Sequence, residues 1–82
     1  MKLSEGKIGE VYYVKSIQLG TPAKRRLEIL GMTGNAVVEV LNSKKSGTKI
    51  IKVRGTRFAI GREFADGIEV EHTKKDEVVA DE

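Results

Sequence analysis

Nine glycines, spread from Gly6 to Gly67, divide this 82-residue chain into short segments along most of its length. Such punctuation is typical of a small all-β fold with many tight corners. A chain this short makes one domain at most, and it buries only roughly 60–65% of the surface that it exposes when unfolded. We therefore expect one mainly β domain over residues 1–72, with a thin core and no volume for a deep substrate cavity.

Five segments between the glycines are rich in Val and Ile and are four to eight residues long, which is typical of β-strands. The polar run of residues 43–47 is a hairpin loop, and Arg54-Gly55 forms a two-residue corner in which Gly supplies the positive φ angle. These turns place three strands in one antiparallel meander, so the sequence predicts a small β-barrel of about five strands. The predicted strands are Glu10–Ile17, Ala36–Leu41, Lys49–Val53, Thr56–Ile60 and Ile68–Glu71.

One segment between the first and second strands breaks the β pattern. Thr21 is a good N-cap, Pro22 fits the first helical position, and Gly31 suits a left-handed stop. The sequence thus predicts one short helix of nine residues between strands 1 and 2. A helix this short does not persist alone, so one apolar face should pack over an open end of the barrel. That face comprises Ala23, Leu27 and Leu30.

A one-turn helix is expected before the last strand, from Arg62 to Asp66. We expect this turn to bring Phe64 and Ala65 into the core. After His72 the sequence offers too few apolar side chains to pack as an element. Residues 73–82 are therefore interpreted as a flexible charged tail.

The charge of the chain is uneven. The net charge is +3, but the tail carries four acids and two bases, so residues 1–72 hold 13 bases and 8 acids, a net +5. This balance favours an acidic partner, and it is equally compatible with an ordinary solvated surface. The sequence contains neither an apolar run near the ~20 residues of a membrane span nor the apolar stretch of a secretory signal. We expect a soluble, cytoplasmic protein.

The inventory of reactive side chains argues against an enzyme. The chain has no Cys and one His, and its carboxylates are spread singly, so no acid–base or nucleophilic set assembles. His72 lies near Glu69 and Glu71 in the sequence, but a transition-metal site usually needs three or four ligands. The glycines match neither a phosphate loop nor a dinucleotide fingerprint. We expect no catalytic residue, no metal site and no cofactor.

The basic cluster Lys24-Arg25-Arg26 is more informative. It lies in the first turns of the predicted helix, where cations are unfavourable by about 0.3–1 kcal/mol each at low salt. Lys24 can pair with Glu28, four residues later, whereas Arg25 and Arg26 have no such local partner. A local rule that is broken without compensation is a place to look for function.

Arg25 and Ile29 share the helix face opposite the predicted buried one. An Ile flanked by an Arg on a face that should be wet indicates a docking surface for a protein partner. The alternative is that Ile29 is tucked under the connection of residues 31–35. The sequence leaves both open.

The second strand carries a similar imbalance. Alternation places Val37, Glu39 and Leu41 together on one face, so that if Glu39 faces water, Val37 and Leu41 do too. Either the helix covers these two apolar side chains, or they form an apolar strip for a partner or for self-association into a homo-oligomer. The candidate partner-binding residues are therefore Arg25, Arg26, Ile29, Val37 and Leu41.

Nucleic-acid binding is the competing use of a basic barrel. It normally needs aromatic stacking platforms among the bases. Only four aromatics are available, and two of them, Phe58 and Phe64, are expected in the core. We expect no nucleic-acid partner.

Two stretches are specific enough to indicate a family. Residues 23–33 carry Arg-Arg-Leu-Glu-Ile-Leu-Gly-Met, and residues 53–65 carry Val-Arg-Gly-Thr-Arg-Phe-Ala-Ile-Gly-Arg-Glu-Phe-Ala. Together with Ile68-Glu69-Val70 they resemble FeoA, the small accessory protein of bacterial ferrous iron transport, and the similarity runs from about Leu3 to Val70. One departure is Gly34-Asn35, where the family often has Pro-Gly.

The resemblance implies an SH3-like small barrel that performs no chemistry. Its implied partner is the FeoB-type membrane permease, whose cytoplasmic part carries a GTP-binding domain. The same module is similar to the C-terminal domain of DtxR-type iron-dependent repressors. The alternative function is therefore an SH3-like regulatory or nucleic-acid-binding module.

Overall fold

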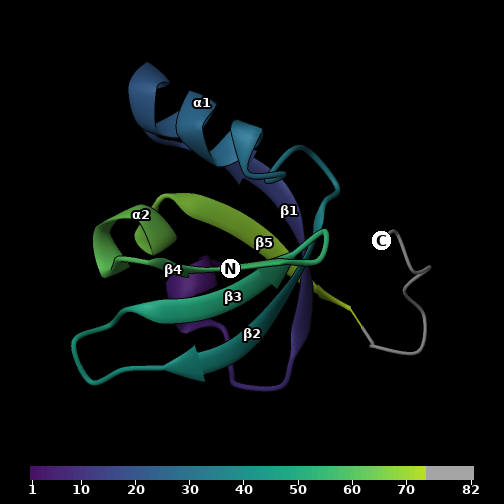
Figure 1. Ribbon diagram of the computed structural model, residues 1–82, viewed down its shortest axis with the longest axis vertical. Helices are drawn as coiled ribbons and strands as arrows, with labels where there is room; N and C mark the ends of the chain where they lie inside the picture. The colour runs from purple at the N-terminus through teal and green to yellow at the C-terminus, as the bar shows by residue number, and fades with distance from the viewer. Residues whose placement is uncertain (74–82) are drawn as a thin grey trace.

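The computed structural model describes residues 1–73 (Figure 1). The protein is mainly β, with two small α-helices and one short 3-10 helix. The predicted tail lies outside the described residues, except that Thr73 belongs to the last strand. The elements in chain order are η1 (Leu3–Glu5), β1 (Val11–Ile17), α1 (Thr21–Ile29), β2 (Val37–Ser43), β3 (Lys49–Val53), β4 (Thr56–Ile60), α2 (Arg62–Asp66) and β5 (Ile68–Thr73).

The five strands form one antiparallel sheet in the order β4-β3-β2-β1-β5. The predicted strand number and the meander of β2, β3 and β4 are confirmed. The predicted barrel is supported only loosely, because the sheet is not closed: β4 and β5 do not pair within residues 1–73 and remain its two edges. The physical reason is that α2 fills the connection between these two strands, so they do not meet as a hairpin.

The core lies on one face of the sheet. Alternate residues of each strand point to this face, as the period of a β-strand requires. Leu3 of η1 and Ala65 of α2 are fully buried and close the core at its ends. The largest fully buried side chains are Tyr12, Leu3, Met32, Ile51, Ile68, Val14, Val38, Val40, Val53 and Val70.

α2 has the predicted bounds, but Phe64 is not in the core. Its side chain is 46% exposed, whereas the neighbouring Ala65 is fully buried. A single helical turn can direct only one of two adjacent side chains toward the sheet, because successive residues are rotated by about 100°. The prediction for Ala65 is therefore confirmed and that for Phe64 is wrong.

α1 begins one residue earlier than predicted. Gly20 is the N-cap, with an extended backbone and a carbonyl that accepts the amide of Lys24 at 3.0 Å. Thr21 is therefore the first helical residue, and its side chain makes no capping hydrogen bond.

The end of α1 is a Schellman motif. Gly31 has φ of +104°, and the amides of Gly31 and Met32 donate to the carbonyls of Glu28 and Leu27 at 3.0 and 2.9 Å. The predicted left-handed stop at Gly31 is confirmed. The chain then turns toward the sheet, where Met32 is fully buried.

Only part of the predicted helix stripe is buried. Leu27 is 7% exposed, but Ala23 is only half-buried and Leu30 is 36% exposed. Leu30 is the C-cap of α1, with ψ of −1°, so the regular helical spacing no longer aims its side chain at the core. Figure 1 accordingly shows α1 standing at one end of the molecule, away from most of the sheet.

Arg54 ties the exit of α1 to the sheet. Arg54 and Gly55 form the predicted corner between β3 and β4, and both have positive φ angles, +50° and +79°. The Arg54 guanidinium donates to the Gly31 carbonyl at 3.2 Å and to the Thr33 hydroxyl at 3.3 Å. α1 is thus attached through Leu27, Met32 and Arg54.

Among residues 1–73, no helix is long and apolar enough to cross a bilayer.

Candidate protein-binding surface

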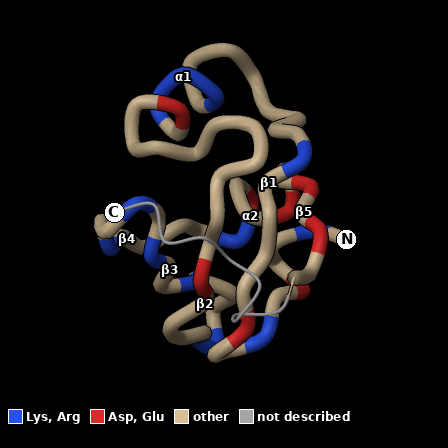
Figure 2. Tube along the Cα trace, turned by 90° about the vertical axis from the view of Figure 1, so that its right-hand side faces the viewer, with Lys and Arg blue, Asp and Glu red and all other residues tan. Residues whose placement is uncertain are grey.

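The outer face of α1 is fully available to solvent. Arg25 and Arg26 are exposed, and Ile29 is 85% exposed, more than any other large apolar side chain among residues 1–73. Figure 2 shows the basic positions that follow one another along α1. The alternative in which Ile29 is tucked under the following connection is therefore wrong.

The basic side chains of α1 have no acidic partner in the described part of the chain. Lys24, Arg25 and Arg26 make no ion pair there, so the expected pairing of Lys24 with Glu28 does not form. Three neighbouring cations that find no partner within residues 1–73 can interact with an acidic group of another molecule.

The field of the α1 helix does not disfavour every cation of this cluster. Arg26 lies in the last turn of α1, where the field of the helix favours a cation. The sequence-based placement of Arg26 near the helix start is wrong, because a nine-residue helix has only two and a half turns. The exposure of the arginines, rather than an unfavourable field, is what identifies this surface.

Leu30 is also exposed next to Ile29 in the chain, although the sequence predicted it to be buried. Ile29 and Leu30 together present adjacent apolar side chains at the end of α1, 85% and 36% exposed. The signal that would have found Leu30 is its position directly before Gly31, since a C-cap residue leaves the helical repeat. We name Arg25, Arg26, Ile29 and Leu30 the α1 face.

Val37 and Leu41 lie on a different surface. Val38 and Val40 are fully buried, so Val37 and Leu41 point to the opposite face of the sheet, where both are half-buried. Val37 pairs with Tyr13 of β1, and Leu41 is the extra residue of a bulge opposite β3. α1 does not cover this apolar strip.

The two predicted groups of partner-binding residues are not brought together. Figures 1 and 2 both show α1 at one end of the molecule and β2 running toward the opposite end. The α1 face and the outer strip of β2 are therefore two separate candidate surfaces.

His72 is engaged within the fold. Its Nε2 atom lies 2.6 Å from a carboxylate oxygen of Glu10, and its ring contacts Tyr12 edge-on at 5.4 Å between centroids. Glu69 and Glu71, its neighbours in sequence, pair instead with the N-terminal ammonium and with Lys15. Within residues 1–73 no group of three His, Cys, Asp or Glu side chains is placed to hold a metal ion.

Comparison with protein families gives one assignment. The FeoA domain model matches residues 1–72, which is nearly all of the described chain. A search of curated protein sequences gave no match.

Several solved structures share the fold. An iron uptake regulatory protein (FeoA) is 37% identical, with a TM-score of 0.82, over 89% of this chain and 97% of that one. The FeoA protein from Chlorobium tepidum is 33% identical, with a TM-score of 0.82, over 88% of this chain and 70% of that one. FeoA from Stenotrophomonas maltophilia, solved with zinc and described as a prokaryotic SH3 domain protein, is 26% identical, with a TM-score of 0.79, over 92% and 98% of the two chains.

A manganese-dependent transcriptional repressor also shares the fold. The alignment has 17% identity and a TM-score of 0.76, and it covers 83% of this chain but 39% of the repressor. This likeness concerns the fold alone.

Proposed function

Because this chain belongs to the FeoA family, we propose that it is a non-enzymatic, cytoplasmic accessory protein of ferrous iron uptake that binds and modulates a FeoB-type permease. The observation that carries the proposal is the α1 face, where arginines that form no ion pair with residues 1–73 flank an Ile that is 85% exposed. The Stenotrophomonas relative is described as a candidate activating factor of ferrous iron transport, in agreement with a modulating role.

The chemistry of the α1 face suits an acidic partner surface with an apolar recess. A guanidinium presents several N–H donors in a planar fork and can bind a carboxylate through two hydrogen bonds. Ile29 would enter the recess and exclude water around these charged contacts, which is the usual anatomy of an energetically dominant interface site. The proposed contact therefore combines an apolar anchor with flanking charge.

The attachment of α1 supports this use. Leu27 and Met32 fix the inner side of the helix and its exit, and Arg54 holds the exit loop. The outer side chains are thus presented on an ordered element and need little further ordering on binding, which lowers the entropic cost of association.

The outer strip of β2 is a second contact in this proposal. Val37 and Leu41 are half-buried, so each offers less apolar area than Ile29. We assign this strip either to a weaker contact with the permease or to a homo-oligomer. A change of oligomeric state on mutation of Leu41 to Ser, measured by analytical ultracentrifugation, distinguishes the two.

The experiment that tests the function is co-purification of the permease from native membranes with a tagged chain. The permease should be recovered, and recovery should fall as salt rises, because exposed charges are screened over about 8–10 Å at 0.1–0.15 M salt. The variant R25E/R26E should lose recovery. The matched variant K44E/K45E changes the charge equally at the exposed β2–β3 hairpin and should retain it.

An equal loss of permease recovery in R25E/R26E and K44E/K45E would show that net charge alone drives the contact. Failure to recover the permease with the unmodified chain at any salt concentration would contradict the proposed partner.

A further inference from the structure

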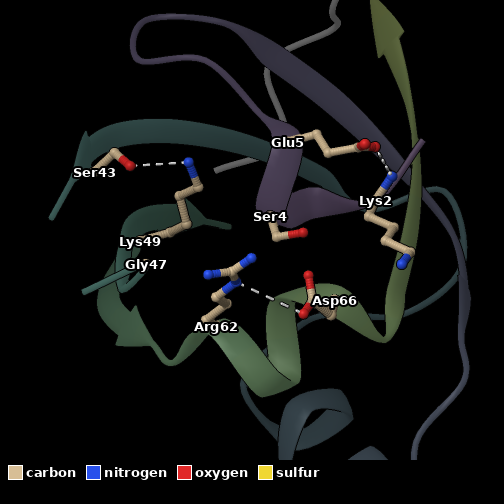
Figure 3. A pocket seen from close by; sticks show the side chains of 8 residues that line it. All are labelled: Lys2, Ser4, Glu5, Ser43, Gly47, Lys49, Arg62 and Asp66. Carbon is tan, nitrogen blue, oxygen red and sulfur yellow. Dashed lines mark hydrogen bonds and ion pairs between the residues drawn. The ribbon is translucent and has the colours of Figure 1, made fainter. Parts of the chain in front are cut away.

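A polar cavity lies on a part of the molecule that the α1 face does not use. Its volume is about 400 Å³, it is open to solvent on one side, and its walls come from η1, the end of β2, the β2–β3 connection with the start of β3, and α2 (Figure 3). Its lining is rich in charged and hydroxyl side chains and includes no residue of α1. The lining residues are Lys2, Ser4, Glu5, Ser43, Gly47, Lys49, Arg62 and Asp66.

Lys49 is a buried cation at this cavity. It is only 7% exposed, and its ammonium donates to the Gly6 carbonyl and to the Ser43 hydroxyl, both at 2.9 Å. Both acceptors are neutral, and no carboxylate of the described chain forms an ion pair with Lys49. Burying an ammonium without an opposite charge is unfavourable. Because an ammonium has three donors, one remains beyond these two bonds.

Arg62 provides a second cation, and its position is built into the fold. A Cβ atom at Gly47 would lie 2.8 Å from Cδ and 2.9 Å from Cβ of Arg62, so only glycine lets the Arg62 stem cross the hairpin there. Gly47 also has φ of +96°, which other residues rarely adopt. Figure 3 shows the Arg62 guanidinium directed into the space between Ser4 and Lys49.

The donors of Arg62 are largely unused. Its Nε atom lies 4.0 Å from Asp66, too far for a hydrogen bond, and its guanidinium makes no hydrogen bond to any other residue in 1–73. The Glu5 carboxylate is engaged elsewhere, since it accepts the amide of Lys2 at 3.0 Å. With three basic and two acidic side chains, the lining carries a net charge of +1.

We propose that this cavity binds a small tetrahedral oxyanion of the phosphate type, held between the Lys49 ammonium, the Arg62 guanidinium and the hydroxyls of Ser4 and Ser43. The anion would supply the counter-charge that Lys49 lacks. Donors from four chain segments surround the space, and a tetrahedral anion presents oxygens in several directions, whereas a carboxylate presents two in one plane.

The test is a titration of the full chain with sodium phosphate at constant ionic strength, followed by backbone amide NMR shifts. Saturable shifts should occur at Ser4, Gly47, Lys49 and Arg62, and not along α1. Sodium acetate at the same ionic strength should produce much smaller shifts at these residues.

The main variant is Arg62→Gln, because the Arg62 side chain is 72% exposed and its loss leaves the core intact. We expect phosphate affinity to fall by about tenfold or more, the loss typical of a hydrogen bond to a charged group. Arg57→Gln removes the same charge from an exposed position of β4 and should leave the affinity unchanged. Lys49→Met should abolish phosphate binding, provided that the dispersed amide spectrum shows that this variant is folded. If Lys49→Met unfolds, Ser4→Ala replaces it as the second variant beside Arg62→Gln and should also weaken phosphate binding.

Three results would overturn the proposal. They are the absence of saturable shifts with phosphate, equal phosphate affinity in Arg62→Gln and the unmodified chain, and equal affinity for acetate and phosphate. The first two would show that the cavity holds no specific anion, and the third that it does not select a tetrahedral one.

Discussion

Leu27 and Ile29 show how two neighbouring apolar side chains of one helix divide between stability and binding. Leu27 is the buried residue of α1, whereas Ile29 is 85% exposed. Burying an apolar side chain stabilises the fold by about 1.5–3 kcal/mol relative to leaving it exposed. The attachment of α1 thus depends on Leu27, and Ile29 is free for a partner.

Replacing Leu27 by Ala should lower the free energy of unfolding by about 2–5 kcal/mol, because it removes a buried side chain and leaves a cavity. Replacing Ile29 by Ala should change it by no more than about 0.5 kcal/mol. Urea denaturation monitored by circular dichroism measures the free energy of unfolding of both variants. Similar losses in the two variants would mean that Ile29 packs against the domain in solution.

At the scale of residues, the sequence placed Arg25 and Ile29 on one helix face but left open whether Ile29 is exposed, and the structure shows that it is. The burial of Lys49 was not predicted, although the signal was present. Lys49 is two and four residues before Ile51 and Val53 in β3, and both of these are fully buried. Because side chains alternate between the two faces of a strand, Lys49 is expected on the same inward face. The exposure of Phe64 had no such signal, because a single helical turn does not follow a regular repeat, whereas Leu30 could have been found only from its place directly before Gly31.

At the scale of elements, local rules predicted most boundaries. β3, β4 and α2 have the predicted bounds, because each lies between glycines in the sequence, and the turns before β3 and between β3 and β4 contain residues with a positive φ angle. β2 continues past its predicted end to Ser43, since the bulge at Leu41 keeps the pairing with β3. Arg54 contacts Gly31 and Thr33 at the exit of α1, which precede it in the sequence by 23 and 21 positions. No local sequence pattern predicts a contact over that separation.

This contact predicts how α1 is held. Arg54→Gly keeps the corner between β3 and β4, because glycine accepts the φ of +50° that Arg54 adopts, but it removes the guanidinium donors. Amide hydrogen exchange should become faster at Leu30, Gly31 and Met32 and stay unchanged in the centre of β3. Unchanged exchange at all three amides would show that Leu27 and Met32 suffice to hold the helix.

At the scale of the whole molecule, the sheet is open where the sequence predicted a barrel. Strand number follows from local segments, but closure depends on whether β4 and β5, with α2 between them, come close enough to pair. The sequence pattern does not specify that distance. The basic cluster of α1, in contrast, was predicted from the sequence, and Figure 2 shows further basic positions over β3 and β4 that were not.

The modest charge predicts weak binding to nucleic acids. Residues 1–72 carry a net +5. Of the four aromatics Tyr12 is buried, Tyr13 and Phe58 are half-buried, and Phe64 is 46% exposed, so only one of them offers an exposed ring for stacking. Binding to generic duplex DNA or single-stranded RNA should be weak and should decrease steeply with salt in a fluorescence anisotropy titration. Sub-micromolar affinity at physiological salt would instead support the repressor-like alternative.

The domain should fold without its last nine residues. The core consists of residues between Leu3 and Val70, and residues 74–82 offer only Val78, Val79 and Ala80 as apolar side chains. Ending the chain after Thr73 should therefore move the melting temperature by less than about 4 °C, which corresponds to under 1 kcal/mol for a domain of this size. A larger decrease in a calorimetric scan would mean that the tail packs on the domain.

The central claim is that the α1 face binds the permease, and the most direct measurement is the affinity of the double variant R25E/I29S for the purified permease. The variant should fold with the stability of the unmodified chain, since both side chains are exposed. Its affinity should fall by about thirtyfold or more, because an anchor residue and its flanking charge commonly contribute 2 kcal/mol or more. The matched variant K44E/I8S changes an exposed Lys and a 58% exposed Ile elsewhere and should bind normally. A folded R25E/I29S variant that binds as tightly as K44E/I8S would contradict the account.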